Sequence, residues 1–323
     1  MEENFMNALE VRNLSKSFKD FALQNLTFSI PFGSALGLIG ENGAGKSTTI
    51  ALILGLLQPD AGQISILDQS LSQSIDLKED IGTVFDEACF PDGINARKVD
   101  LIEALLYKNW SSETYFDYIQ RFNLPETKAF KAYSRGMKMK LALAVALSHN
   151  AKILLLDEAT GGLDPLAREE LLEELKKFLS DGAHAILLSS HIVSDIEKLC
   201  SHVAFLHKGR LILNEKKETL LSAYPQKSLE DILSWMLQRR CGINETTWTD
   251  TKRCVRTMDA KPNIDSYDFY ISLDSSFLRR RPHAWKHCHA AAGHISNSIR
   301  SSNTDSRSSF NRENSLAALH PSF

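Results

Sequence analysis

A glycine-rich stretch that ends in a lysine and two hydroxyl residues is suited to phosphate chemistry. Residues 40–48 read GENGAGKST, fit the pattern GxxxxGK[ST] and follow the apolar run 35–39. Glycines let backbone N–H groups surround phosphate oxygens without a Cβ clash, and the start of a following helix adds partial positive charge. We expect a loop that binds a nucleoside triphosphate through Gly40, Glu41, Asn42, Gly43, Ala44, Gly45, Lys46, Ser47 and Thr48.

Two side chains of this loop have separate expected roles. The ammonium of Lys46 should reach the β- and γ-phosphates, and the hydroxyl of Ser47 should ligate Mg²⁺. A chance glycine turn is the alternative interpretation. A buried strand before the loop and a helix after it favour the phosphate-binding role.

An acidic pair ends the second apolar run of this kind. Residues 152–158 read KILLLDE, and the carboxyl end of a parallel strand faces the ligand crevice of an α/β fold. We expect Asp157 to hold Mg²⁺, directly or through water, and Glu158 to act as general base toward the attacking water. Acidic pairs at strand ends are usually solvated edges, but a phosphate loop elsewhere in the chain favours catalysis.

His191 follows a third apolar run, residues 185–190. It could reach the γ-phosphate as a hydrogen-bond partner. A lone histidine after a strand is more often a structural or surface residue. The residues alone therefore leave both interpretations open.

Alternating strands and helices are predicted to position these residues. This alternation implies an α/β fold with a mainly parallel sheet covered on both faces, interrupted by a helical insert over about 94–150. The predicted strands are 9–11, 26–30, 35–39, 63–67, 153–156, 185–188 and 203–206, and the predicted helices are 49–56, 101–106, 115–122, 140–148, 165–180, 193–200 and 228–233.

The motif Tyr133-Ser134-Arg135-Gly136-Met137 lies between the glycine-rich loop and the acidic pair, and it precedes an Ala/Leu-rich helix about twenty residues before Asp157. This motif resembles the signature of ABC-type ATPases. Further matches to that family are the D-loop pair Leu163 and Asp164, Phe18 at the place of an aromatic residue that stacks on adenine, and His191 at the place of the switch histidine. The resemblance covers about 5–215.

The resemblance implies a P-loop NTPase fold with an N-terminal antiparallel β subdomain and a helical insert, about 88–150, that carries the signature. Its implied ligands are ATP and Mg²⁺. Two copies are implied to pack head to tail, so that Ser134 and the N–H of Gly136 contact ATP held by the other copy. A separate membrane permease is the implied partner, with the chain at the cytoplasmic face of the membrane and an unknown substrate exported.

The sequence departs from the family pattern at several positions. Tyr133, Arg135 and Met137 replace the usual residues of the signature, and Gly161 stands where serine is usual. Asp86 stands where the family normally has a glutamine that touches Mg²⁺. Asp86 could still ligate Mg²⁺, although it adds negative charge near the γ-phosphate. Because Asp-Glu occurs here in a similar subgroup of bacterial exporter ATPases, we interpret it as a trait of that subgroup.

Composition narrows the classes of function. The 323 residues carry a net charge of -3, which argues against a general nucleic-acid binder, and no nucleic acid is expected as a partner. The five cysteines show no CxxC spacing, which fits a reducing compartment better than a disulfide framework. No apolar run approaches the ~20 residues that span a bilayer.

The composition changes after a predicted helical extension at 216–237. Residues 238–323 hold 13 Lys+Arg against 8 Asp+Glu, a balance of +5, and lack a sustained apolar period. We predict a disordered tail or one derived from a frameshift, whose shifted frame resembles the start of a permease. A basic tail on anionic lipid, a small domain and a metal site remain alternatives, the last using His283, His287, Cys288 and His289.

Two further functions compete with the transport motor. A soluble ABC ATPase of translation or DNA maintenance would carry two cassettes or a long coiled-coil insert, and the sequence shows one cassette and neither addition. A non-functional product of a frameshifted gene would bind ATP without forming a stable complex with a permease. An ordinary phosphate-loop kinase or GTPase is disfavoured by the motif at 133–137.

Overall fold

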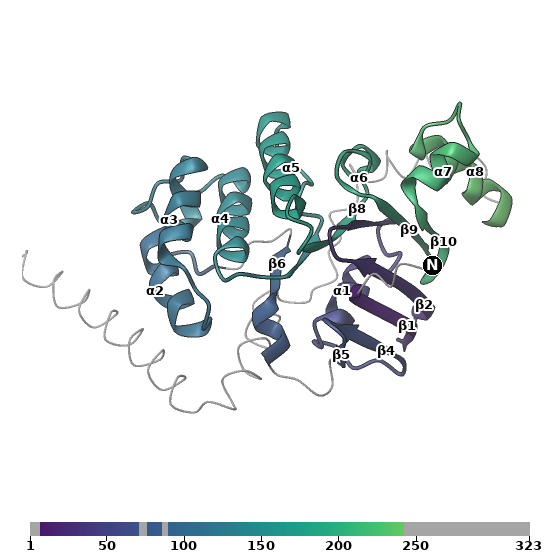
Figure 1. Cartoon of the computed structure of the whole chain (residues 1–323), viewed down its shortest axis with the longest axis horizontal. Helices are drawn as coiled ribbons and strands as arrows, with labels where there is room; N and C mark the ends of the chain where they lie inside the picture. The colour runs from purple at the N-terminus through teal and green to yellow at the C-terminus, as the bar shows by residue number, and fades with distance from the viewer. Residues whose placement is uncertain (1–6, 71–75, 86–89, 242–323) are drawn as a thin grey trace, which may run out of the picture. The chain divides into compact units, whose positions relative to one another are not determined.

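Two β-sheets form the frame of the fold (Figure 1). The computed structural model describes residues 7–70, 76–85 and 90–241. Asp86 and nearly all of the predicted tail, from residue 242 onward, lie outside the described residues. The division into an ATPase domain, a helical extension and a tail therefore stays a prediction.

The larger sheet has six strands in the order β10-β9-β3-β8-β7-β6. Neighbouring strands run parallel except β10, which pairs antiparallel with β9, so the predicted mainly parallel sheet is confirmed. The strands are β3 (Ala35–Ile39), β6 (Ile81–Phe85), β7 (Ile153–Asp157), β8 (Ala185–Ser190), β9 (His202–His207) and β10 (Arg210–Lys216).

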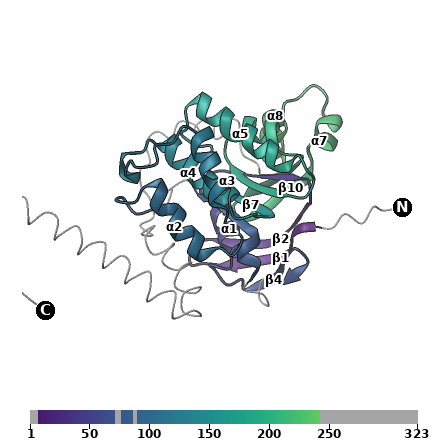
Figure 2. The same ribbon diagram turned by 60° about the vertical axis from the view of Figure 1, so that its left-hand side comes forward.

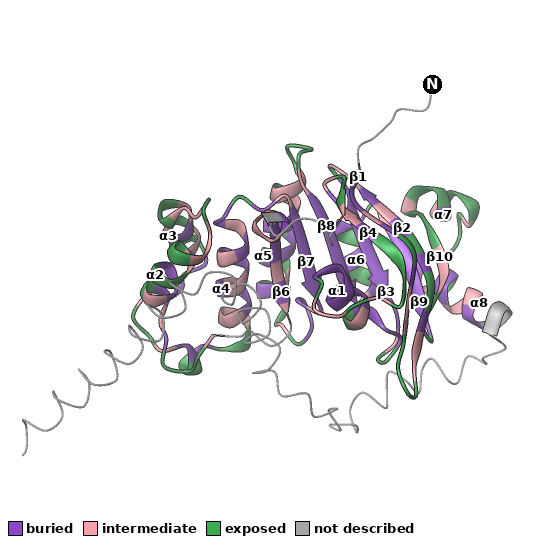
Figure 3. Ribbon diagram, turned by 90° about the horizontal axis from the view of Figure 1, so that it is seen from below, coloured by how far each residue is buried: buried purple, intermediate pink, exposed green. Residues whose placement is uncertain are grey.

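The central strands β3, β7 and β8 are buried along their whole length because both of their faces are covered (Figure 3). In β7, Leu154 and Leu156 belong to one hydrophobic core, whereas Ile153 and Leu155 belong to another. Successive side chains of a strand point to opposite faces, so each central strand contributes to two cores. Apolar side chains can therefore fill the whole strand up to its carboxyl end, where the polar residues begin.

The smaller sheet covers one face together with helix α1 (Lys46–Ile53). It is antiparallel, with strand order β2-β1-β4-β5, which confirms the predicted antiparallel subdomain near the N-terminus. Its strands are β1 (Asn7–Ser17), β2 (Ala22–Pro31), β4 (Ala61–Ile66) and β5 (Gln69–Ser70).

Three helices form the predicted insert and lie side by side at one end of the larger sheet (Figure 1 and Figure 2). They are α2 (Ala96–Leu106), α3 (Ser112–Arg121) and α4 (Arg135–Leu147), with a short 3₁₀ segment at Phe130–Ala132. Another 3₁₀ segment, Asp76–Asp80, leads into β6. Each of the three begins after a side chain that accepts a hydrogen bond from the first turn: Asn95, Ser111 and Ser134.

The remaining helices cover the other face of the larger sheet. They are α5 (Pro165–Leu179), α6 (Val193–Leu199), α7 (Lys217–Ala223) and α8 (Leu229–Cys241). Four helices, α1 to α4, begin earlier than predicted, and in two of them a functional motif is the reason. Helix α1 begins at Lys46 rather than Thr49, and α4 begins at Arg135 rather than Lys140. In both, polar residues of a functional motif form the first turn, so the apolar pattern starts later than the helix.

Candidate phosphate-binding and catalytic site

The glycine-rich loop connects β3 to α1 and depends on glycine conformations. Gly43 has φ 80° and Gly45 has φ 110°, values that L side chains rarely adopt. A Cβ on Gly45 would lie 2.5 Å from the Leu23 side chain, so space excludes other residues there as well. Gly45 is the N-cap of α1, and no side chain caps that end. The first N–H groups of α1 are thus left for a ligand, which suits an anion.

The Lys46 ammonium is buried and bound by oxygens of the protein. Its Nζ donates to the carbonyl oxygen of Gly40 at 2.8 Å and of Glu41 at 3.3 Å, and lies 3.1 Å from Glu158 Oε1. The Lys46 side chain is 5% exposed. An ammonium has three donors, so these oxygens can satisfy all of them. Phosphate oxygens entering the loop must compete with these groups for Lys46.

Asp157 ends β7 with one oxygen unsatisfied. Its Oδ1 is buried and has no hydrogen-bond partner among the described residues, and the residue is 9% exposed. Burial raises the pKa of Asp157, and the Ser47 hydroxyl partly opposes that shift. A second carboxylate, Glu158, raises the pKa further. A cation would compensate the charge of this buried carboxylate. The oxygen donors of Ser47 and Asp157 are of the kind that Mg²⁺ prefers.

Glu158 lies between two nitrogen groups. One oxygen faces Lys46, and Oε2 lies 2.7 Å from His191 Nδ1. Its backbone has φ 52°, and its N–H donates to the Ser189 carbonyl at 2.9 Å. Burial alone would raise the pKa of Glu158, but His191 and Lys46 outweigh burial and hold it below its usual value. An ionised, oriented carboxylate can accept a proton from water.

The structure therefore brings together most residues that the sequence singled out for chemistry. Lys46, Glu158 and His191 form one chain of contacts, and Ser47 adjoins Asp157. His191 is half exposed and is oriented by Glu158 rather than buried as a structural residue. Asp86 lies outside the described residues.

The signature residues and the D-loop form a second cluster where two helices begin. Ser134 accepts a hydrogen bond from Met137 N at 3.2 Å, and Asp164 accepts one from Ala167 N at 3.0 Å. A Cβ on Gly136 would contact Ala167 at 3.5 Å and Leu163 at 4.0 Å. Within the described ranges, Ser134 and Gly136 make no hydrogen bond to residues 40–48 of their own chain.

Arg135 connects this cluster to the loop after Glu158. A Cβ on Gly162 would lie 2.7 Å from Arg135 Nη1, so the guanidinium occupies the space that a side chain at Gly162 would fill. The Gly161 N–H donates to the Glu158 carbonyl at 3.0 Å. The absence of side chains at these two glycines accommodates the arginine of the signature.

Phe18 is exposed and is joined to the phosphate loop by an aromatic residue that the sequence analysis missed. Phe18 is 44% exposed, and its ring stacks on Phe21 with centroids 6.3 Å apart. A Cβ on Gly45 would lie 2.7 Å from the Phe21 ring, so Phe21 packs against the loop. An aromatic residue three positions after Phe18, in the same β1–β2 turn, was the available signal.

A second residue missed from sequence is His207. It is buried, and its Nδ1 lies 2.9 Å from Glu41 Oε1 in the phosphate loop. Like His191, it stands at the end of an apolar strand, here β9. That position was a signal, but the partner is far away in sequence.

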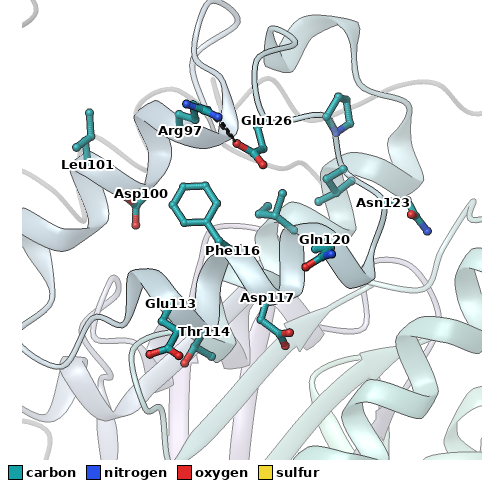
Figure 4. Close-up of a pocket in the computed structure, with 13 residues that line it drawn as sticks. Arg97, Asp100, Leu101, Glu113, Thr114, Phe116, Asp117, Gln120, Asn123 and Glu126 are labelled. Atoms are coloured by element: carbon teal, nitrogen blue, oxygen red, sulfur yellow. Dashed lines mark hydrogen bonds and ion pairs between the residues drawn. The ribbon is translucent and has the colours of Figure 1, made fainter.

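The helical insert carries an open groove of about 1390 Å³ between α2 and α3 (Figure 4). Arg97 and Glu126 face each other at its rim, with 2.8 Å between Nη2 and Oε2. Leu101 lines the groove and is 67% exposed. The lining has one basic residue, Arg97, and four acidic residues: Asp100, Glu113, Asp117 and Glu126.

Comparison with known proteins gives consistent results. Residues 23–161 match the protein family described as ABC transporter. The chain is 34% identical over 212 residues to the lantibiotic transport ATP-binding protein SrtF of Streptococcus pyogenes, a match that covers 64% of this chain and 90% of that protein. It is 34% identical over 194 residues to the bacitracin transport ATP-binding protein BcrA of Bacillus licheniformis, covering 59% of this chain and 63% of the relative.

A solved structure supports the same likeness. The structure of an ATP-binding subunit of an ABC transporter superposes with a TM-score of 0.65 at 28% identity, covering 71% of this chain and 99% of the other. In the part of the chain that the structure describes, none of the helices combines the length and the apolar character needed to cross a bilayer.

Proposed function

This chain belongs to the ABC transporter family of ATP-binding proteins, and we propose that it is the ATP-hydrolysing subunit that energises export through a separate membrane permease. The observation that carries the proposal is the chain of contacts from Lys46 through Glu158 to His191 beside the glycine loop. The relatives named as lantibiotic and bacitracin transport ATP-binding proteins support the coupling of ATP binding to transport.

ATP binds with its phosphates on residues 40–48. The N–H groups at the start of α1 and the ammonium of Lys46 hold the phosphate oxygens. Phe18, exposed and supported by Phe21, stacks on adenine. Ser47 and Asp157 would hold Mg²⁺, with Asp86 as a further candidate ligand, and the ion would neutralise charge on the phosphates.

Hydrolysis uses Glu158 as the general base. The carboxylate accepts a proton from water, the water oxygen attacks the γ-phosphorus, and the bond from that phosphorus to the bridging oxygen of ADP breaks. In the free protein Glu158 is bound to Lys46. Phosphate binding draws Lys46 away, and Glu158 then stays oriented by His191, which also faces the γ-phosphate.

Two copies pack head to tail around ATP. Support comes from the start of α4, where Ser134 and the Gly136 N–H are placed at a helix N-terminus and Ser134 and Gly136 make no hydrogen bond to their own phosphate loop. Such an end is suited to a second anion contact. Leu163 and Asp164 lie beside the start of α4 and therefore also face the partner copy. Closure on ATP and opening after hydrolysis supply the mechanical stroke.

The permease docks on the helical insert. The groove between α2 and α3 combines the exposed Leu101 with an excess of carboxylates, which suits a short amphipathic helix with basic residues. This contact holds the subunit at the cytoplasmic face of the membrane.

The test uses the full-length chain purified alone and from membranes of its host. The purified chain should hydrolyse Mg-ATP, and the chain purified from solubilised membranes should carry a multi-spanning protein that stimulates hydrolysis in lipid vesicles. Hydrolysis without any stimulating membrane partner would instead support a soluble ATPase. A folded chain that binds ATP but never turns it over would support a non-functional gene product.

A further inference from the structure

We propose that His207 positions the phosphate loop for ATP by holding the carboxylate of Glu41. His207 is then a positioning residue for ATP binding, and it acts through Glu41 rather than through contact with nucleotide. The inference rests on the proposed assignment of residues 40–48 to the triphosphate.

The pair is largely removed from water. His207 is 6% exposed, and its Nδ1 lies 2.9 Å from Glu41 Oε1, whose side chain is 26% exposed. Nδ1 is thus the ring nitrogen that faces the carboxylate, at the distance of an ion pair. Breaking one partner of such a pair leaves a partly buried charge without compensation.

His207 belongs to the hairpin of β9 and β10, which runs along the phosphate loop. The Gly209 N–H donates to the Ala44 carbonyl at 3.0 Å. A Cβ on Gly40 would lie 2.5 Å from the Leu206 carbonyl oxygen, so the backbones of loop and hairpin are in direct contact there. Glu41 is thus held between two further points of contact with the same hairpin.

The hairpin is itself fixed by other elements. The Gln24 N–H on β2 donates to the Gly209 carbonyl at 2.8 Å, and Arg210 Nε donates to Gln24 Oε1 at 2.9 Å. Strand β9 is hydrogen-bonded to β3, which leads into the loop. His207 therefore stands on a support that cannot shift without breaking the larger sheet.

The negative charge of Glu41 explains why its contact with His207 matters for nucleotide binding. Glu41 is the only acidic residue in 40–48, and the loop must accept the negative triphosphate. Its backbone carbonyl also accepts from Lys46 at 3.3 Å, so the orientation of Glu41 bears on the lysine. With His207 present, the carboxylate is paired and directed to the hairpin. Without it, an unpaired negative charge remains on the loop that binds phosphates.

The first experiment replaces His207 by leucine, which keeps a similar volume and removes the ring nitrogen that faces Glu41. The dissociation constant for ATP, measured by calorimetric titration of the full-length chain, should rise about tenfold, while kcat at saturating ATP should change less than about twofold. His207→Asn places an amide donor near the position of Nδ1 and should keep the affinity within about threefold of wild type.

A double-mutant cycle then tests the route through Glu41. In a Glu41→Gln background, His207→Leu should cause no further loss of ATP affinity, because no charge remains to be held. An equal loss in both backgrounds, or no loss in either, would overturn the proposal. If His207→Leu does not fold, His207→Asn is compared with His207→Gln, whose amide lies near Nε2 instead; equal ATP affinities would also overturn it.

Two controls separate this inference from its premises. His149→Leu removes another buried histidine, one bound to the Glu79 carbonyl, and should lower stability without changing ATP affinity. Lys46→Ala should weaken ATP binding strongly. If Lys46→Ala has no effect, the assignment of the loop fails; if it weakens binding while His207→Leu does not, only the role of His207 fails.

Discussion

At the scale of single residues, the site is organised around competition for one ammonium. Lys46 is held by two carbonyls and by Glu158, and Glu158 is shared with His191. In the free protein, the proposed general base Glu158 is thus paired with Lys46, the residue proposed to bind the phosphates. A triphosphate separates the two, so binding and activation of the base are linked.

Glu158→Gln should test that link. Removing a general base lowers turnover by about 10²–10⁴-fold, while ATP affinity should stay equal or increase, because the neutral amide competes less for Lys46. Steady-state hydrolysis and calorimetric titration measure the two quantities. Glu173→Gln, an exposed carboxylate on α5 paired with Lys176, is the matched control and should change neither. Wild-type turnover in Glu158→Gln would remove Glu158 as the base.

Lys46→Ala should remove the ammonium that the phosphates need. We expect ATP affinity to fall by at least about tenfold and turnover to become undetectable, because an interaction with a charged group is lost from a buried site. The same titration and hydrolysis assays apply. Unchanged turnover would contradict the assignment of the loop.

At the scale of elements, helix ends carry much of the proposed chemistry. Ser134 caps α4 and Ser111 caps α3 by the same kind of hydrogen bond, at 3.2 and 3.1 Å. The two serines therefore have comparable structural roles, yet only Ser134 lies in the signature motif. A comparison of variants at the two serines therefore distinguishes loss of a helix cap from loss of a nucleotide contact.

Replacing each serine by alanine should lower the free energy of unfolding by about 1 kcal/mol. Only Ser134→Ala should reduce ATP hydrolysis, by about tenfold or more, and weaken ATP-dependent dimerisation of a Glu158→Gln background. Thermal unfolding, hydrolysis and light scattering measure the three effects. Equal hydrolysis by the two variants would mean that Ser134 is a helix cap alone.

A buried histidine just after α4 contacts the segment that precedes β6. His149 is stacked on Tyr107 with centroids 4.0 Å apart, and its Nδ1 lies 3.0 Å from the Glu79 carbonyl. Burial lowers the pKa of His149 to about 4. Its folded pKa is below the unfolded value of about 6.5, so the unfolded chain binds more protons between these values.

Stability from His149 is complete above pH about 6.5 and is lost as the pH falls toward 4, a loss of about 3 kcal/mol. Denaturant unfolding at several pH values should show a steeper decline in wild type than in His149→Leu, which has no proton to gain there. Equal slopes in the two proteins would contradict the assigned pKa.

At the scale of the whole molecule, the groove on the helical insert and the ATP site belong to different parts of the described chain. A change in the groove should therefore affect the partner and not the chemistry. Leu101→Asp replaces an apolar side chain that is 67% exposed, so folding should tolerate it.

The variant should hydrolyse ATP at the wild-type rate when alone and lose stimulation by the permease, because the apolar contact between Leu101 and the permease helix is removed. Hydrolysis with and without permease in lipid vesicles measures this. Undiminished stimulation would place the permease elsewhere.

The comparison of sequence and structure shows which features are local. The buried strands β3, β7, β8 and β9 were predicted because apolar runs are a property of the segment itself. Strand β10 is an edge strand with several exposed polar residues, and it was missed for that reason. The contact between His207 and Glu41 depends on the order of strands in the sheet, which no local pattern encodes.

The division of each central strand between two cores has a consequence for changes in chain length. In β7, neighbouring residues alternate between the cores, and Asp157 and Glu158 follow directly. Insertion or deletion of one residue within 153–156 would exchange the two sets of side chains and move both carboxylates by one position. The interior of β7 therefore does not tolerate a change in length.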